Sequence, residues 1–210
     1  MRHIIAHQGY QQTCQEHGLN VENIDLFIEK HLAAFTPNET PTILHMLGIP
    51  GAGKTTLVKQ LARDNTAVVS FDDIMEELPE YRDDMAQHGA DTAFERWEVC
   101  AREIGYEVLF RAIERKLNLI FDNSGSRSDH VTLLTELKNS GAYRVEIAAI
   151  HISEELALKR AAQRARFLPP EYIPIRHKAI EALLPAYKAL ADEYTDYYAT
   201  ETGFKSKTAA

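Results

Sequence analysis

A glycine-rich stretch in the first third of the chain has the residue types and the spacing that bind phosphate. It covers residues 48–55, and its sequence is G-I-P-G-A-G-K-T. Every fixed position of the phosphate-binding loop pattern G-x-x-x-x-G-K-[ST] is present. Glycines let the backbone come close to an anion, and successive backbone N–H groups then converge on phosphate oxygens at a helix N-terminus. The stretch therefore predicts a site for a nucleoside triphosphate.

The residues of this loop have separate predicted roles. Lys54 is expected to reach the β- and γ-phosphates, and the hydroxyl of Thr55 to hold Mg²⁺. The other predicted nucleotide contacts are Gly48, Pro50, Gly51, Ala52, Gly53 and Thr56. Residues 42–47 indicate a buried strand before the loop, and residues 56–63 indicate a helix with one apolar face after it. A strand, a loop and a helix in this order are the context that the pattern requires.

Carboxylate side chains follow two further predicted strands. Asp72 and Asp73 come directly after segment 66–71, which is rich in β-branched residues, and Asp122 follows the apolar segment 117–121. In an α/β sheet the carboxyl ends of the strands border the crevice where ligands bind. We expect Asp72 to accept the proton of an acceptor hydroxyl during phosphoryl transfer. Asp73 is expected to cap the next helix or to contact the substrate, and capping alone is the alternative for either aspartate.

The loop that begins at Asp122 is expected to serve the metal and the substrate. An acidic residue after an apolar strand is typical of phosphate-loop proteins, in which it orients Mg²⁺ or its bound water. Asp122 is assigned this role, or a hydrogen bond to the acceptor. Ser124 and Arg127 lie on the same loop and are expected to contact the substrate.

A basic run in the last third of the chain predicts a lid. Residues 159–166 contain no acidic side chain, and Arg160 and Arg164 are four residues apart on one helix face, with Arg166 just beyond. Arginines suit a lid that closes over a triphosphate and neutralises the charge on the transferred group. The alternative is a solvated basic face paired with the acidic residues at positions 154 and 155.

The order of segments predicts the fold and its divisions. Strands and helices alternate, which indicates right-handed crossovers and a three-layer α/β fold with a central, mostly parallel sheet flanked by helices. Residues 1–40 are expected to form a helical extension and linker, with a helix capped by Asn20 that packs against the domain or occludes its site. Residues 41–200 are expected to form the phosphate-loop domain, with a last helix that extends to residue 198, and residues 201–210 are expected to be a flexible tail.

The composition is that of a globular protein. The chain has 210 residues, a net charge of −8 and an apolar share of 45%. No apolar run approaches the roughly 20 residues that span a bilayer, and the N-terminus has no signal-peptide core. Cys14 and Cys100 have no metal or redox spacing, which favours reduced thiols in a cytoplasmic protein. The acidic charge argues against a nucleic-acid partner.

The motifs and their order resemble the zeta-toxin family of phosphate-loop kinases. The likeness covers about residues 42–190 and includes the phosphate loop, the segment V-V-S-F-D-D-I-M-E-E-L-P-E-Y and the segment K-R-A-A-Q-R-A-R. The spacing from Asp72 through Pro79 to Tyr81 is the most particular part. The resemblance implies a kinase that uses ATP and Mg²⁺, a hydroxyl-bearing acceptor such as UDP-N-acetylglucosamine, and a partner antitoxin.

Two departures from this family concern the acceptor. The family often has an arginine three residues after the base, where this chain has Met75, and its E-G-T loop is D-N-S here, at residues 122–124. A phage-type polynucleotide 5′-kinase is the nearest alternative, because it resembles the chain in the phosphate loop, the aspartate pair and the arginine lid. A non-catalytic ATP-binding regulator is the alternative from another functional class, and its nucleotide binding would not depend on Asp72.

Overall fold

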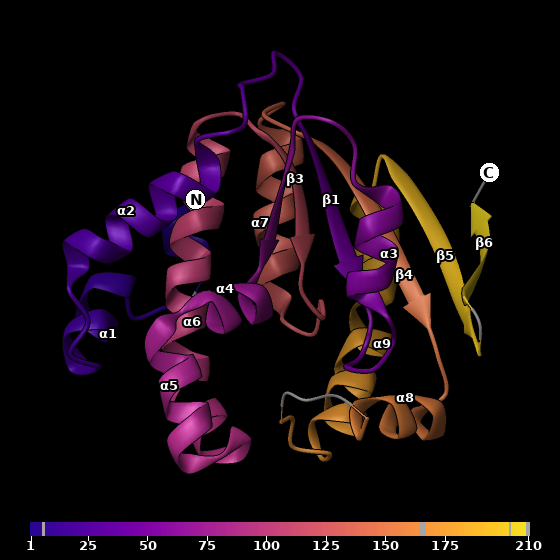
Figure 1. Cartoon of the computed structure of the whole chain (residues 1–210). Coiled ribbons are helices and arrows are strands. Elements are labelled where there is room, and N and C mark those ends of the chain that lie inside the picture. Colours follow the sequence, from indigo (N-terminus) through magenta and orange to yellow (C-terminus); the bar gives the residue numbers. More distant parts are fainter. Residues whose placement is uncertain (6, 164–166, 202, 209–210) are drawn as a thin grey trace.

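The computed structural model contains a six-stranded sheet with the strand order β2-β3-β1-β4-β5-β6 (Figure 1). Neighbouring strands from β2 to β5 are parallel, and β6 is antiparallel to β5. The structure describes residues 1–5, 7–163, 167–201 and 203–208. The predicted α/β fold with a mostly parallel central sheet is confirmed.

The bounds of the strands are β1 Thr42–Leu47, β2 Thr66–Ser70, β3 Asn118–Asp122, β4 Arg144–His151, β5 Glu193–Thr200 and β6 Gly203–Thr208. The central strand β1 is buried on both faces because its alternate residues enter two apolar clusters. Ile43 and Leu47 join the larger cluster, whereas Leu44 and Met46 pack with the smaller one. Such burial is typical of parallel strands covered by helices on both sides.

The bounds of the helices are α1 Tyr10–Glu16, α2 Val21–Leu32, α3 Lys54–Leu61, α4 Phe71–Glu77, α5 Pro79–His88, α6 Ala90–Glu114, α7 Ser128–Asn139, α8 Glu154–Ala161 and α9 Tyr172–Leu190, after a short 3₁₀ turn at Arg2–Ile4. Helix α3 lies in front of the sheet in Figure 1, and α7 lies behind it. The side chain of Asn20 accepts a hydrogen bond from the N–H of Asn23 at 3.1 Å, so the predicted cap of α2 is confirmed. No helix of the described residues is long and apolar enough to cross a membrane.

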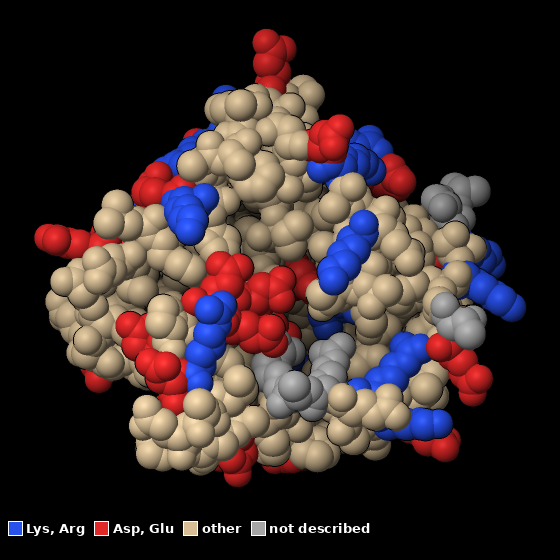
Figure 2. Space-filling model, viewed as in Figure 1, with Lys and Arg blue, Asp and Glu red and all other residues tan. Residues whose placement is uncertain are grey.

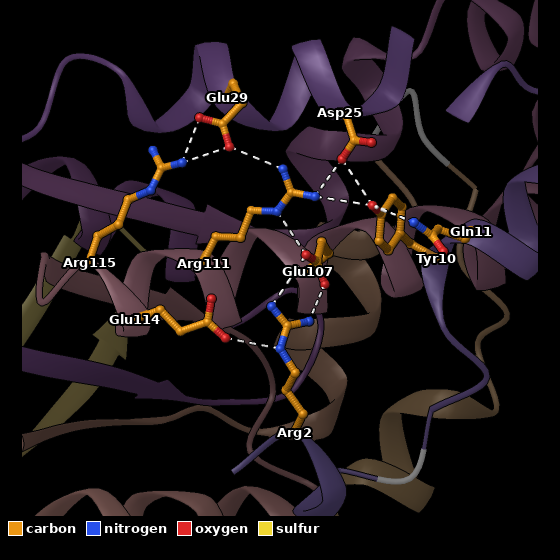
Figure 3. A network of polar contacts seen from close by, with 9 residues as sticks. All are labelled: Arg2, Tyr10, Gln11, Asp25, Glu29, Glu107, Arg111, Glu114 and Arg115. Atoms are coloured by element: carbon orange, nitrogen blue, oxygen red, sulfur yellow. Dashed lines mark hydrogen bonds and ion pairs between the residues drawn. The ribbon is translucent and has the colours of Figure 1, made fainter. Parts of the chain in front are cut away.

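The N-terminal helices α1 and α2 pack on α6, at the left edge of Figure 1. A network of ion pairs joins them to this helix (Figure 3). Arg111 of α6 pairs with Asp25 and Glu29 of α2, and Arg2 pairs with Glu107 of α6. The N-terminal segment therefore packs against the domain, which is the first of the two outcomes expected from sequence.

The C-terminal part of the chain differs from its prediction. A helix was expected to extend to residue 198, but α9 ends at Leu190 and runs through Pro185 as one helix. The predicted flexible tail is also wrong for residues 203–208, since they form β6. Segment 193–200 is rich in aromatic and β-branched residues, and its pairing with β4 decides its conformation. Such long-range pairing leaves little signal in a local pattern.

Candidate active site

The phosphate loop has the geometry that the sequence predicts. Gly53 is the N-cap of α3, and Lys54 is the first residue of that helix. The Nζ atom of Lys54 lies 2.9 Å from the carbonyl oxygen of Gly48, so its side chain folds back over the loop. Gly51 has φ +85°, and a Cβ atom there would lie 2.3 Å from the carbonyl oxygen of Ala157 on α8. Only glycine allows α8 to pack this closely on the loop.

Strand register places the predicted acidic residues beside this loop. Asp122, the last residue of β3, pairs with Met46 of β1 on one side and with Ser70 of β2 on the other. After Ser70 at the end of β2, the chain enters α4 directly, so that Asp72 and Asp73 lie in the first turn of this helix. Ser70 is the N-cap, because its Oγ accepts a hydrogen bond from the N–H of Asp73 at 3.2 Å. The predicted capping role of Asp73 is therefore wrong.

A cavity of about 210 Å³ extends from the phosphate loop toward α4 and α6. It brings together the predicted residues Pro50, Lys54, Asp72, Asp122, Ser124 and Arg127. Figure 2 shows acidic side chains gathered near α4 in the middle of this face, with basic side chains around them. The phosphate loop, the predicted base and the predicted metal-binding aspartate thus border one cavity.

The same cavity is lined by charged residues that the sequence analysis missed. Arg102 and Glu98 of α6 line it and form an ion pair with Nη1 and Oε1 3.0 Å apart. Arg176 of α9 lines it as well, and burial lowers the pKa of this arginine while the charges of Asp72 and Glu98 partly offset the effect. One local signal existed for the α6 pair, since its charges interrupt a broad apolar face. The approach of α9 to the cavity had no local signal.

Contacts with Leu47 and Tyr187 hold the loop after β3 in place. Gly125 has φ +73°, and a Cβ atom there would lie 2.2 Å from a methyl carbon of Leu47. The hydroxyl of Tyr187 donates to the carbonyl oxygen of Gly125 at 3.1 Å. These contacts fix the backbone that carries Ser124 and Arg127, both of which face the cavity.

The residues buried beneath this loop include polar groups that carry no charge. His45 and His130 are fully buried there, and the Nε2 atom of His130 lies 2.9 Å from the hydroxyl oxygen of Tyr106. Burial lowers the pKa of His45 to about 3 and that of His130 to about 4. Burial also raises the pKa of Tyr106 to about 12. All of these groups are uncharged near neutral pH, so the charge in the cavity comes from its walls.

The predicted lid arginines are only partly described. Arg160 does not line the cavity; its Nη2 atom donates to the carbonyl oxygen of Thr200 at 2.6 Å, at the end of β5. Glu154, one of the two acidic residues in the alternative prediction, pairs with His177. Arg164 and Arg166 lie outside the residues that the structure describes.

The residues at the loop fit a magnesium ion. Thr55 supplies a hydroxyl in the first turn of α3, and Asp122 supplies a carboxylate at the end of β3. Oxygen donors of this kind suit Mg²⁺, which in nucleotide sites takes most of its other ligands from phosphate and water. Within the described part of the chain, no cluster of three His, Cys, Asp or Glu side chains forms a preassembled metal site.

Residues 28–200 match the family model described as Zeta toxin. The chain belongs to the zeta-toxin family. The resemblance found in the sequence is thereby confirmed.

Solved structures with the same fold include a toxin–antitoxin system and a second, two-component complex. One comes from the PezAT chromosomal toxin–antitoxin system of Streptococcus pneumoniae, with 16% identity, a TM-score of 0.66, and coverage of 88% of this chain and 79% of that chain. The other is the AvrRxo1-ORF1:-ORF2 complex, with 15% identity, a TM-score of 0.67, and coverage of 90% of this chain and 66% of that chain. At these identities the likeness shows the fold. No curated protein matches the chain.

Proposed function

We propose that this zeta-toxin family member is an ATP- and Mg²⁺-dependent kinase that transfers the γ-phosphate to a hydroxyl group of a small molecule. The observation that carries the proposal is the shared cavity, in which Lys54 of the phosphate loop and Asp72 of α4 line the same space. A donor phosphate and an acceptor hydroxyl must meet in such a space for transfer to occur. A related complex, AvrRxo1-ORF1:-ORF2, has been solved with ATP, which supports the choice of nucleotide.

Each residue of the site has a defined task in this proposal. The backbone of loop 48–55 and the ammonium of Lys54 hold the phosphates and offset charge on the transferred group. Thr55 and Asp122 would hold Mg²⁺, which when bound supplies further positive charge to the phosphate oxygens. Asp72 accepts the proton of the acceptor hydroxyl as the new bond to phosphorus forms.

The charges of the cavity favour an anionic acceptor. Met75 lines it at the position where the family often has an arginine. Arg102, Arg127 and Arg176 line the same cavity from α6, the loop after β3 and α9, and they supply positive charge from elsewhere. Arginine is suited to binding phosphate through two hydrogen bonds. A UDP-sugar such as UDP-N-acetylglucosamine, with its diphosphate and free hydroxyls, is therefore the first acceptor that we propose.

The test is ATP consumption by the purified protein against a panel of UDP-sugars, nucleosides and 5′-hydroxyl oligonucleotides, with Lys54→Ala and Asp72→Asn alongside. Phosphorylation of a UDP-sugar that both variants abolish is the expected result. Transfer to oligonucleotide ends would instead make the protein a polynucleotide kinase. If the protein binds ATP but transfers phosphate to no acceptor, and Asp72→Asn does not change ATP binding, the protein is a non-catalytic ATP-binding regulator.

Toxicity and an antitoxin partner belong to the same proposal. The PezAT system is described as a toxin–antitoxin pair, and AvrRxo1-ORF1 was solved in complex with AvrRxo1-ORF2. We expect expression of this chain alone to slow the growth of a bacterial host, and Lys54→Ala to restore growth. Equal growth inhibition by both forms would separate toxicity from phosphoryl transfer.

A further inference from the structure

We infer that Phe204 of the β5–β6 hairpin and Arg160 of α8 together form the surface on which the base of the nucleotide stacks, which we call the base seat. This inference rests on the proposed use of ATP, and it starts from the position of the phosphate loop in the sheet. The loop follows the central strand β1, and the acceptor cavity lies toward β3 and β2, where Asp122 and Asp72 line it. Because the γ-phosphate must face that cavity, the nucleoside end leaves the loop in the opposite direction, toward β4, β5 and β6.

A ring and a guanidinium border the loop on that side. A Cβ atom built on Gly53 would lie 3.0 Å from the ring atom Cζ of Phe204 and 3.8 Å from Nη1 of Arg160. Gly53 directly precedes Lys54 and the first turn of α3. Two flat groups from distant parts of the chain thus meet at the last glycine of the loop. Neither of them lines the acceptor cavity.

The hairpin, α8 and the loop hold one another in place. Phe204 of β6 pairs with Ala199 of β5, and its ring lies 6.5 Å from the ring of Tyr197. Arg160 donates to the carbonyl oxygen of Thr200 at 2.6 Å, which ties α8 to the end of β5. On its other side, α8 packs against the loop at Gly51. The ring and the guanidinium are therefore fixed relative to the phosphate-binding backbone.

Aromatic rings and guanidinium groups are the side chains on which nucleobases stack. A base that leaves the loop beside Gly53 meets the ring of Phe204 and the side chain of Arg160. Stacking needs no particular hydrogen-bonding pattern, so the seat contributes affinity for any purine nucleotide. This assigns a binding role to residues 203–208, which the sequence analysis placed in a tail, and changes the role of Arg160 from phosphate neutralisation to base contact.

A purely structural role is the alternative, because Phe204 also packs with the smaller apolar cluster. The two roles differ in which part of the nucleotide they serve. A structural role supports the loop itself, so its loss would weaken the binding of every phosphate compound. A base seat serves the nucleoside alone, so its loss would spare inorganic tripolyphosphate.

The experiment measures the affinity of the purified full chain for ATP and for inorganic tripolyphosphate by titration calorimetry. We expect Phe204→Ala to weaken ATP binding by about 5- to 100-fold, which is the usual contribution of one stacked aromatic residue. The affinity for tripolyphosphate should change by less than about twofold, which is within the error of the measurement. Phe204→Trp should retain the affinity for ATP, and its fluorescence should respond to ATP and not to tripolyphosphate.

Tyr198→Ala is the matched control. Tyr198 lies on β5 of the same hairpin, is 46% exposed and stacks on His151 rather than on Phe204. Its removal should leave both affinities unchanged. Equal losses for both ligands in Phe204→Ala, or no loss for ATP, would overturn the base seat while leaving ATP binding in place. A wild-type chain that binds neither ligand, or a Lys54→Ala variant that binds both normally, would overturn the proposed function as well.

Discussion

Helix α6 joins two regions that use the same residue types for opposite purposes. Near its start, Glu98 and Arg102 line the cavity in which we propose that the acceptor binds. Near its end, Glu107, Arg111 and Arg115 bind the N-terminal helices through the network of Figure 3. The network joins residues 2–29 to residues 107–115, whereas none of the described residues of segment 1–40 lines the cavity. This separation argues against the N-terminal helices as a cover for the site.

The two regions differ in how their buried arginines are compensated. Burial lowers the pKa of Arg111, but the hydrogen bonds that it donates to Glu107, Asp25 and Glu29 outweigh this effect and raise the value. Burial also lowers the pKa of Arg176 in the cavity, and there the neighbouring charges do not reverse the effect. An arginine of the second kind gains most from an incoming anion. The comparison therefore separates a structural charge cluster from one that is suited to a ligand.

The largest expected effect concerns Asp72. Asp72→Asn keeps the size of the side chain and removes its ability to accept a proton, so kcat should fall by about 10²- to 10⁴-fold. The affinity for ATP should stay within about twofold, because the phosphate loop is intact. Initial rates with the acceptor identified from the panel, together with ATP titrations, check both parts. Asp73→Asn is the matched control and should retain most of the activity, because Asp73 does not line the cavity.

The histidines beneath the cavity are expected to make the protein sensitive to mild acid. Burial lowers the pKa of His45 to about 3 and of His130 to about 4, from an ordinary value of 6.5. Their contribution to stability is complete above pH 6.5 and is lost as the pH falls through the folded-state values. The free energy of unfolding should fall by several kcal/mol between pH 6.5 and 4, as measured by urea denaturation. His130→Gln should flatten this pH dependence, and an unchanged slope would contradict the assignment.

Arg176 is expected to affect the acceptor and little else. Arg176→Met removes the charge and keeps the apolar stem, so the KM for an anionic acceptor should rise by about 10- to 100-fold. The KM for ATP should change little. The matched variant in the other region, Arg111→Met, should leave both constants unchanged. Equal changes in KM for the two substrates would show that Arg176 supports the whole site rather than the acceptor.

The parts of the site that could be predicted are those encoded in short segments. The phosphate loop has a fixed spacing, and Asp72 and Asp122 follow strands whose ends a parallel sheet brings together. Local pattern and global fold agree at these positions. This agreement is why the phosphate loop and the two aspartates could be predicted from the sequence.

The parts that could not be predicted depend on contacts between distant segments. Arg176 lines the cavity because the first turns of α9 reach it. Phe204 contacts Gly53 because β6 adds to the edge of the sheet. Segment 193–200 was expected to continue the helix before it, and its pairing with β4 makes it a strand. The ion pairs of Arg111 with Asp25 and Glu29 join residues more than 80 positions apart. Sequence spacing contains no record of such pairs.

The smallest expected effect concerns the N-terminal network. Arg111→Met leaves the buried carboxylate of Glu107 with one arginine instead of two. It also removes the arginine partner of Asp25 on α2, while Glu29 keeps its ion pair with Arg115. Because solvent screens the exposed partners, the free energy of unfolding should fall by about 1–3 kcal/mol at pH 7. Urea denaturation measures the loss. Lys188→Met, at an exposed ion pair with N and O 3.9 Å apart, is the control and should cost less than about 1 kcal/mol.

The pH dependence of this loss identifies its cause. Burial raises the pKa of Asp25 and of Glu107, but hydrogen bonds from arginine outweigh it, so both values lie below the ordinary 3.8 and 4.5. The contribution of these carboxylates is therefore complete above about pH 4.5 and is lost as the pH falls further. Arg111→Met should be less stable than wild type at pH 7, and the difference should shrink below pH 4. A difference that stays constant across this range would mean that lost packing of the arginine stem, and not its charge, carries the effect.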